Sequence, residues 1–243
     1  MKHLLFRSIT LVALLPLPAL LAAEDAKPPA ATQPVEVEKG FTSIFDGKTF
    51  DGWEGNLKCF RIADGAIVGG TLTEKVARNE FLCTKRKYGD FELRLKVKLV
   101  KPGGNAGIQI RSERVPNHWE MRGYQADVGG QWWGKLYDES RRRKVLAAPD
   151  AKGQAKLVKP GDWNDYTIRC EGPRIQLWLN GKRTVDYTEA DPAVLKTDLA
   201  KAGLIGLQIH GGPANEAHYK DLRIRELKAE KKAEGAREGA AAD

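Results

Sequence analysis

Three short segments of this 243-residue chain carry planar hydrogen-bonding groups where a solvated strand would carry long charged side chains. Amides, a carboxyl, an imidazole and a guanidinium can together bind sugar hydroxyls, move a proton and stabilise an anion. If the segments lie side by side in a sheet, their polar faces would form one patch suited to a carbohydrate. The residues of this predicted patch are Gln109 and Arg111, Gln125 and Asp127, and Gln208 and His210.

Aromatic side chains follow the second of these segments. The stretch 123–138, GYQADVGGQWWGKLYD, passes from a strand pattern through a Gly-Gly turn to an aromatic cluster. Large rings on a surface favour a ligand, and they can stack on the apolar face of a pyranose. We therefore predict that this stretch forms one wall of a sugar-sized cleft. The stacking candidates are Trp119, Trp132, Trp133 and Tyr137, and Asn105 is either a turn residue or a further binding residue.

Antiparallel β-strands are the elements that must position these groups. Residues 90–99, DFELRLKVKL, alternate apolar and charged side chains without interruption, which excludes a helix. The stretches 107–111, 124–128 and 204–210 alternate in the same way, and Gly-containing turns separate the segments. Short strands with turns between them and little helical pattern predict an all-β fold. We expect a single domain, a jelly-roll sandwich of two antiparallel sheets with one concave sheet.

The ends of the chain differ in composition from this body. Residues 1–23 combine basic residues, an apolar run interrupted by Pro16 and Pro18, and two final alanines. This pattern is typical of a signal peptide and is too short for a membrane span. We expect 24–39 to be a linker, 40–227 the sandwich domain and 228–243 a charged flexible tail. The predicted location is exported, either periplasmic or secreted.

The charge pattern and the cysteine spacing limit which kinds of partner and metal site the chain is expected to have. The 40 basic and 32 acidic residues give a net charge of +8, scattered except for the run 141–144, RRRK, which we interpret as a solvated loop. This pattern argues against nucleic acid as a partner and leaves anionic cell-surface material open. Cys59, Cys83 and Cys170 lack zinc-ligand spacing. Cys59 and Cys83 could pair, or all three could be core residues.

Several motifs, read in combination, resemble the DUF1080 family, also called the 3-keto-disaccharide hydrolase or 3-keto-glucoside 1,2-lyase/hydratase family. The resemblance extends over nearly all of 40–227. It implies a concanavalin A-like sandwich, export, and cleavage of glycosides that carry a ketone at carbon 3. The motifs are FDGKTFDGW (45–53), YGDFELRLKVKL (88–99), GGNAGIQIR (103–111), GYQAD (123–127), PGDWNDYTIRCEGPRIQLWLNGK (160–182) and GLIGLQIHGG (203–212).

The resemblance also suggests roles for individual residues. A ketone at carbon 3 acidifies the proton on carbon 2, so a base can remove it, a cation can hold the enolate and an acid can assist departure of the aglycone. Our hypothesis is His210 as base, Arg111 as enolate stabiliser and Asp127 as acid or as ligand of a divalent cation such as Ca²⁺. Many relatives carry an acid two positions before the Gln, where this chain has Gly123. The predicted carbohydrate-binding residues are Asn105, Gln109, Gln125, Trp132, Trp133, Tyr137 and Gln208.

Two other functions stay open. A conventional glycosidase needs two carboxylates flanking the glycosidic bond, which Asp127 with Glu139 or Asp138 could supply. A non-catalytic carbohydrate-binding module uses the same kind of sandwich, so the fold alone does not decide between binding and catalysis.

Overall fold

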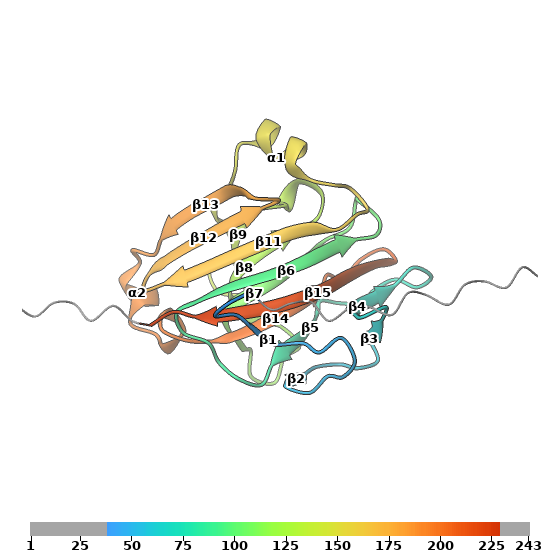
Figure 1. Ribbon diagram of the computed structural model, residues 1–243, viewed down its shortest axis with the longest axis horizontal. Helices are drawn as coiled ribbons and strands as arrows, with labels where there is room; N and C mark the ends of the chain where they lie inside the picture. Colours follow the sequence, from blue (N-terminus) through green and yellow to red (C-terminus); the bar gives the residue numbers. More distant parts are fainter. Residues whose placement is uncertain (1–37, 229–243) are drawn as a thin grey trace, which may run out of the picture. The chain divides into compact units, whose positions relative to one another are not determined.

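Two antiparallel β-sheets pack face to face in the computed structural model, which describes residues 38–228 (Figure 1). One sheet has eight strands, ordered β13 (Lys182–Thr188), β12 (Arg174–Leu179), β11 (Asn164–Glu171), β6 (Phe91–Leu99), β15 (Asn215–Glu226), β4 (Ala66–Thr71) and β3 (Phe60–Ala63), with β1 (Thr42–Ser43) also pairing β15. The other has seven, ordered β10 (Val145–Ala147), β9 (Leu136–Glu139), β8 (Met121–Val128), β7 (Ala106–Arg114), β14 (Leu204–Ile209), β5 (Glu80–Thr84) and β2 (Trp53–Glu54).

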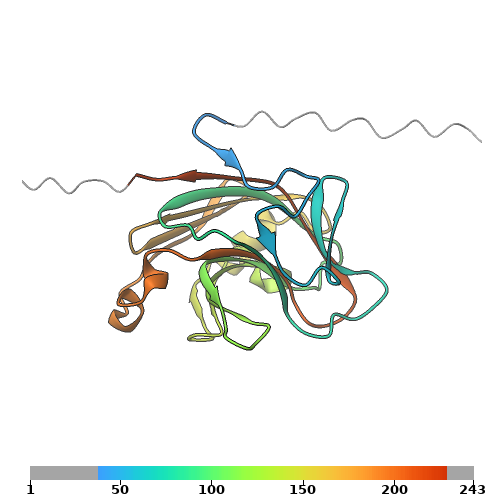
Figure 2. The same ribbon diagram turned by 90° about the horizontal axis from the view of Figure 1, so that it is seen from below.

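The predicted all-β fold, a jelly-roll sandwich of two antiparallel sheets, is confirmed. Figure 2 shows the two sheets as stacked, curved layers. Helices are short within the described residues and lie in connections between strands. They are α1 (Ala151–Leu157), α2 (Pro192–Leu195) and the 3₁₀ turns η1 (Gly130–Trp132) and η2 (Asp198–Ala200).

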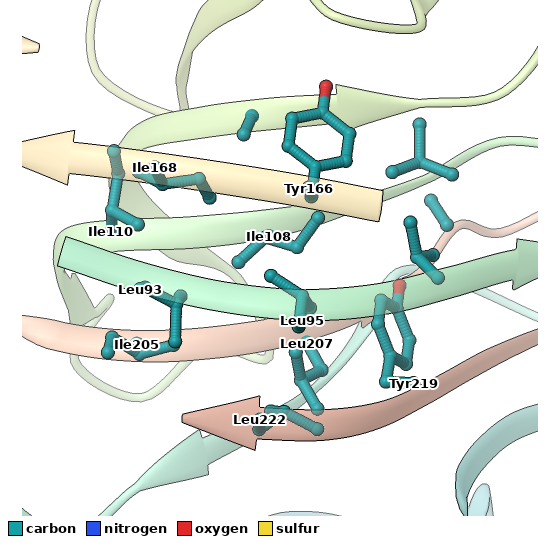
Figure 3. Packing of buried hydrophobic residues seen from close by; sticks show 14 of the residues in the cluster. Leu93, Leu95, Ile108, Ile110, Tyr166, Ile168, Ile205, Leu207, Tyr219 and Leu222 are labelled. Carbon is teal, nitrogen blue, oxygen red and sulfur yellow. The ribbon is translucent and has the colours of Figure 1, made fainter. Parts of the chain in front are cut away.

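Alternating side chains from both sheets build the core between them (Figure 3). Strand β6 points its apolar residues inward, and Leu93 and Leu95 meet the inward residues of β7 and β14. Two core tyrosines of the eight-stranded sheet reach across to the other sheet with their hydroxyls. Tyr166 Oη donates to the carbonyl of Asp127 at 2.8 Å, and Tyr219 Oη donates to the carbonyl of Gln208 at 2.5 Å. The core therefore holds the backbone of two strands that carry predicted site residues.

A bulge in β7 changes which side chains the seven-stranded sheet presents outward. The pairing of β7 with β8 shifts register between Ile110 and Glu113, and Arg111 has the left-handed φ of 44°. One extra residue reverses the alternation, so Ser112 replaces Arg111 as the neighbour of Gln109 on the outer face. The hydroxyl of Ser112 accordingly lies 2.6 Å from Gln109 Oε1.

Arg111 instead ties the two sheets together at one end. Its guanidinium is 1% exposed and donates to the Gly172 carbonyl at 2.5 Å and to the Gly89 and Ala200 carbonyls at 3.1 Å each. It also pairs with the Asp90 carboxylate at 2.5 Å. Asp90 precedes β6 and Gly172 lies in the β11–β12 turn, so one side chain of the seven-stranded sheet fastens two segments of the other.

The predicted terminal segments lie almost wholly outside the described residues. This applies to the expected signal peptide 1–23, to the linker 24–39 except for its last two residues, and to the tail 228–243 except for its first. Within 38–228, no helix is long and apolar enough to cross a membrane. All three cysteines are free thiols, and Cys83 packs with its sulfur 3.1 Å from that of Met121. The alternative of a Cys59–Cys83 disulfide is therefore not observed.

Replacing Arg111 should test its structural role. Arg111→Met leaves three carbonyls and a carboxylate without their cationic donor, so we expect the free energy of unfolding to fall by about 3 kcal/mol. The measurement is denaturant unfolding followed by tryptophan fluorescence. Arg174→Met, which removes an exposed ion pair with Asp186, is the matched control and should change little. Equal effects of the two substitutions would contradict the assignment.

Candidate active site

A pocket of about 250 Å³ opens on the outer face of the seven-stranded sheet. Its walls come from β8 and β9, from the ends of β7 and β14, and from the loops beside them. The lining is almost entirely polar apart from two aromatic rings. The residues are Asn79, Asn105, Glu120, Gln125, Asp127, Trp132, Tyr137, Glu139, Arg143 and His210.

The three segments of the predicted patch are neighbours in this sheet, in the order β14, β7 and β8. Gln109 lies directly opposite Gln125, and Gly107 lies between Gln208 and Asp127. Gly107 needs to be a glycine, because a Cβ atom there would come within 2.4 Å of the Gln125 side chain. The predicted adjacency of the segments is thus correct, although not every patch residue reaches the pocket.

Asp127 is the most deeply buried acid of the pocket. Its side chain lies on β8 with the residue 3% exposed, and Oδ1 accepts a hydrogen bond of 2.8 Å from Gln125 Nε2. Burial raises the pKa of Asp127 to about 8, opposed by the Gln125 hydrogen bond; the Glu139 carboxyl raises the pKa further and the Lys135 ammonium lowers it. At neutral pH this carboxyl holds its proton and can act as an acid.

His210 follows the end of β14 and has an exposed imidazole. Nδ1 lies 2.6 Å from the carbonyl of Gly211, which can only accept, so Nδ1 carries the proton in this contact. The lone pair of a neutral ring is then on Nε2, the nitrogen that can take up a proton. His210 is therefore suited to be the base.

Glu139 and Glu120 add two acids that the predicted site set did not include. Burial raises the pKa of Glu139, and the neighbouring Glu120 carboxylate raises it further. Glu139 lies on β9 directly opposite Gly123 of β8. It thus brings a second carboxyl into the pocket that Asp127 lines. Only the pairing of β8 with β9 shows this, although Glu139 was a candidate in the two-carboxylate alternative.

One indole and one phenol form the aromatic wall. Trp132 and Tyr137 meet edge to face, with ring centroids 6.1 Å apart and planes at 82°. The prediction for Trp133 is wrong, because this side chain is buried in the core and only its neighbour faces the pocket. Consecutive residues in a tight turn point in different directions, so only one indole can face the cleft. Trp119 lies outside the pocket lining and stacks on His118 at 3.9 Å.

Arg111 does not lie in the predicted patch, because the β7 bulge turns it into the contact between the sheets described above. The cation in the pocket lining is Arg143, which comes from the basic run that the sequence marked only as a solvated loop. Its two preceding neighbours serve a structural purpose, since Arg141 and Arg142 both bind the buried Asp138 carboxylate. Asp138 is therefore not available as a pocket acid.

Gln109 and Gln208 lie on the predicted outer face of the sheet, but their side chains do not reach the pocket. Both are fully buried, and neither lines the pocket. Gln109 lies behind Gln125, to which it donates a hydrogen bond of 2.7 Å. As carbohydrate-binding residues they could act only through a neighbour.

Unpartnered acceptors in the lining indicate what kind of ligand fits. Among the described residues, Asn105 Oδ1 and Glu120 Oε2 are buried atoms without a hydrogen-bond partner. Buried polar atoms in folded proteins nearly always have a donor or acceptor, whether from protein, water or ligand. Sugar hydroxyls can supply such donors, so the lining is suited to a polyhydroxylated molecule.

The same residues do not make a divalent-cation site. Within 38–228, no group of three or more His, Cys, Asp or Glu side chains has an arrangement that could hold a metal ion. The donor set therefore does not fit the predicted Ca²⁺-like ion, and no chemical step below is assigned to a metal.

Comparisons with known proteins agree with these features. The model of the 3-keto-alpha-glucoside-1,2-lyase-like domain matches residues 40–225. A protein named 3-keto-disaccharide hydrolase from Bacteroides thetaiotaomicron is 25% identical over 249 aligned positions, covering 80% of each chain.

Solved structures show the same fold. A crystal structure of a candidate glycosyl hydrolase from Parabacteroides distasonis superimposes with a TM-score of 0.58 at 19% identity, covering 78% of this chain and 94% of that one. The carbohydrate-binding module CBM66 from Bacillus subtilis gives 0.51 at 15% identity, covering 71% and 94%. At these identities the likeness concerns the fold alone.

The protonation of Asp127 should be visible in stability measurements. Its pKa is 3.8 in the unfolded chain and about 8 in the folded one, so the wild type loses stability as pH rises from 4 to 8. Asp127→Asn does not titrate and keeps the hydrogen bond from Gln125. The difference in unfolding free energy between this variant and the wild type should therefore increase in favour of the variant, by up to about 1 kcal/mol per pH unit from pH 4 to 8. Above pH 8 the difference should stay constant.

Asp186→Asn provides a control of opposite sign. The Arg174 hydrogen bond lowers the pKa of Asp186 to about 2, so the wild type gains stability as pH rises from 2 to 4. Denaturant unfolding at several pH values measures both variants. A flat difference between Asp127→Asn and the wild type from pH 4 to 8 would show that this carboxyl is ionised in the folded protein.

Proposed function

This chain belongs to the 3-keto-alpha-glucoside-1,2-lyase-like family, and we propose that it cleaves 3-keto-glycosides by removing the proton on carbon 2 and expelling the aglycone from carbon 1. The observation that carries the proposal is one pocket in which His210 offers a basic nitrogen and Asp127 a protonated, buried carboxyl. Elimination next to a ketone needs this combination of base and acid.

The steps follow from the ketone. His210 Nε2 takes the carbon 2 proton, and the electron pair moves onto the carbon 3 oxygen as an enolate. The cation of the pocket, Arg143, is the group we assign to that negative charge in place of Arg111. The enolate then re-forms the ketone, a double bond forms between carbons 1 and 2, and the bond from carbon 1 to the aglycone oxygen breaks. Asp127 gives its proton to that oxygen, so the aglycone leaves as an alcohol.

Net hydrolysis needs one more step, in which water adds across the new double bond. The hydroxyl joins carbon 1 and a proton returns to carbon 2, which His210 can deliver because it received one in the first step. Asp127 must recover its proton from this water or from solvent. Elimination and hydrolysis are therefore two stages of one scheme, and the free 3-keto sugar is the final product.

The remaining lining residues are assigned to binding. Gln125 and Asn105 can donate to and accept from hydroxyls, and Trp132 with Tyr137 offers ring faces and edges to the pyranose. We also propose that the protein is exported, on the signal-peptide pattern of residues 1–23.

Two substitutions should separate the proposed roles. The purified protein is incubated with a 3-keto glucoside and with its unoxidised parent, and aglycone release is followed. Release should occur from the keto substrate alone, and His210→Ala and Asp127→Asn should each lower kcat by about 10²- to 10⁴-fold. His218→Ala, on the other sheet, is the control and should leave the rate unchanged.

A two-carboxylate glycosidase is the second candidate, favoured by the presence of Asp127 and Glu139 in one pocket. It would release the aglycone from the unoxidised parent at least as fast as from the keto substrate. A binding module is the third candidate, since CBM66 has a similar fold. It would show no release from either substrate while sugar binding remains measurable, a result that contradicts both enzyme assignments.

A further inference from the structure

Four buried side chains form a single line of hydrogen bonds that ends at Asp127. Ser112 Oγ donates to Gln109 Oε1 at 2.6 Å, Gln109 Nε2 donates to Gln125 Oε1 at 2.7 Å, and Gln125 Nε2 donates to Asp127 Oδ1 at 2.8 Å. All four residues are 3% exposed or less. The line crosses from β7 to β8 beneath the pocket floor, and only its last two members line the pocket.

The line has one direction. A glutamine amide offers donors on one end and acceptors on the other, so fixing one contact fixes the next. Ser112 Oγ also lies 3.0 Å from the Ile110 carbonyl and 3.3 Å from the Tyr124 carbonyl, but its shortest contact is with Gln109 Oε1 at 2.6 Å. This contact turns the Gln109 amide so that its Nε2 faces Gln125. The Gln125 amide must then receive at its oxygen and donate from its nitrogen. Asp127 Oδ1 is thereby an acceptor, and the proton of the neutral carboxyl is left on Oδ2.

The β7 bulge is what allows this line to start. With regular alternation, Arg111 would follow Gln109 on the outer face and would place a cation there. The left-handed turn at Arg111 brings Ser112 to that position instead. Gly123 leaves room for it, because a Cβ atom at residue 123 would lie 2.3 Å from the Ser112 hydroxyl.

We propose that Ser112 and Gln109, which do not reach the pocket, are positioning residues that act through Gln125 to fix which oxygen of Asp127 carries the proton. This inference rests on the proposed function only for the use that Asp127 makes of that proton. The line itself is a property of the folded protein and is testable without substrate.

Other charged and titratable groups also act on Asp127. Glu139 and Tyr137 come from β9, Lys135 from the turn before it, and Tyr166 from β11 of the other sheet. None of these groups belongs to the line, so substitutions at Gln109 and Ser112 leave them in place. A change in the titration of Asp127 can then be attributed to the hydrogen bond from Gln125, which favours the charged form.

The test is a carboxyl ¹³C NMR titration of Asp127 in the whole protein labelled at aspartate, with Asp127→Asn used to assign the signal. Gln109→Met keeps the side-chain volume and removes both amide contacts. Gln125 is then no longer held as a donor, so the titration midpoint should rise by about 0.5 to 1 pH unit. Ser112→Ala should raise the titration midpoint by a smaller amount, since Gln109 still contacts Gln125. If Gln109→Met does not fold, Ser112→Ala is the variant that tests the proposal.

Thr84→Val is the matched control, because Thr84 is a buried hydroxyl on β5 of the same sheet and lies outside the line. Its midpoint should equal that of the wild type. An unchanged midpoint in the line variants, or an equal rise in Thr84→Val, overturns the proposal.

The kinetic readout separates this inference from the proposed function. If Asp127 is the acid, the alkaline limb of the pH–rate profile should move upward with the NMR midpoint, while KM changes less than about two-fold. If the NMR midpoint of Asp127 shifts but the protein cleaves no keto substrate, the positioning role is supported and the proposed function is contradicted. A moved limb with an unmoved midpoint would assign the limb to another group and overturn the positioning role.

Discussion

The backbone of Arg111 is the constraint on which the seven-stranded sheet depends. A non-glycine residue at a φ of 44° is held against its own preference, at a cost of roughly 1–3 kcal/mol. The guanidinium offsets this cost by binding three carbonyls and Asp90 between the sheets. The same turn reverses the alternation of β7, so the outer face receives Ser112 and stays free of a buried cation next to Gln109. Fold closure and the chemistry of the pocket thus share one strained residue.

Alternation in the sequence was enough to predict the strands, because side chains of a half-buried strand alternate between core and surface with a period of two. The adjacency of β14, β7 and β8 was a hypothesis drawn from their similar polar faces, and only the strand pairing shows it. Alternation could not predict the bulge, since no residue type at 110–113 marks an extra residue. Arg111 was therefore placed on the wrong side. Gln109 was placed on the right face but with the wrong access, because depth beneath a neighbouring side chain is set by tertiary packing.

Loops limited the prediction in a different way. The pair Trp132-Trp133 has the composition of a binding wall, but the 3₁₀ turn sends one ring to the pocket and the other to the core. Arg143 follows two arginines that form ion pairs with Asp138. Nothing in the run RRRK shows which of the three arginines lines the pocket. Glu139 became a neighbour of Gly123 only through strand pairing. Such features depend on where the backbone turns rather than on residue type.

The pKa shifts in the pocket help to decide between two kinds of catalysis, displacement by two carboxylates and elimination next to a ketone. A two-carboxylate glycosidase needs one carboxyl ionised as nucleophile or base and the other protonated as acid. Here burial raises the pKa of Asp127 to about 8, and burial together with Glu120 also moves Glu139 toward its protonated form. The pKa shifts of both carboxyls thus favour the acid role over the carboxylate role. The exposed imidazole of His210 offers a ring nitrogen, Nε2, that can take up a proton. A nitrogen base in the same pocket as a buried acid suits proton abstraction next to a ketone better than displacement at carbon 1.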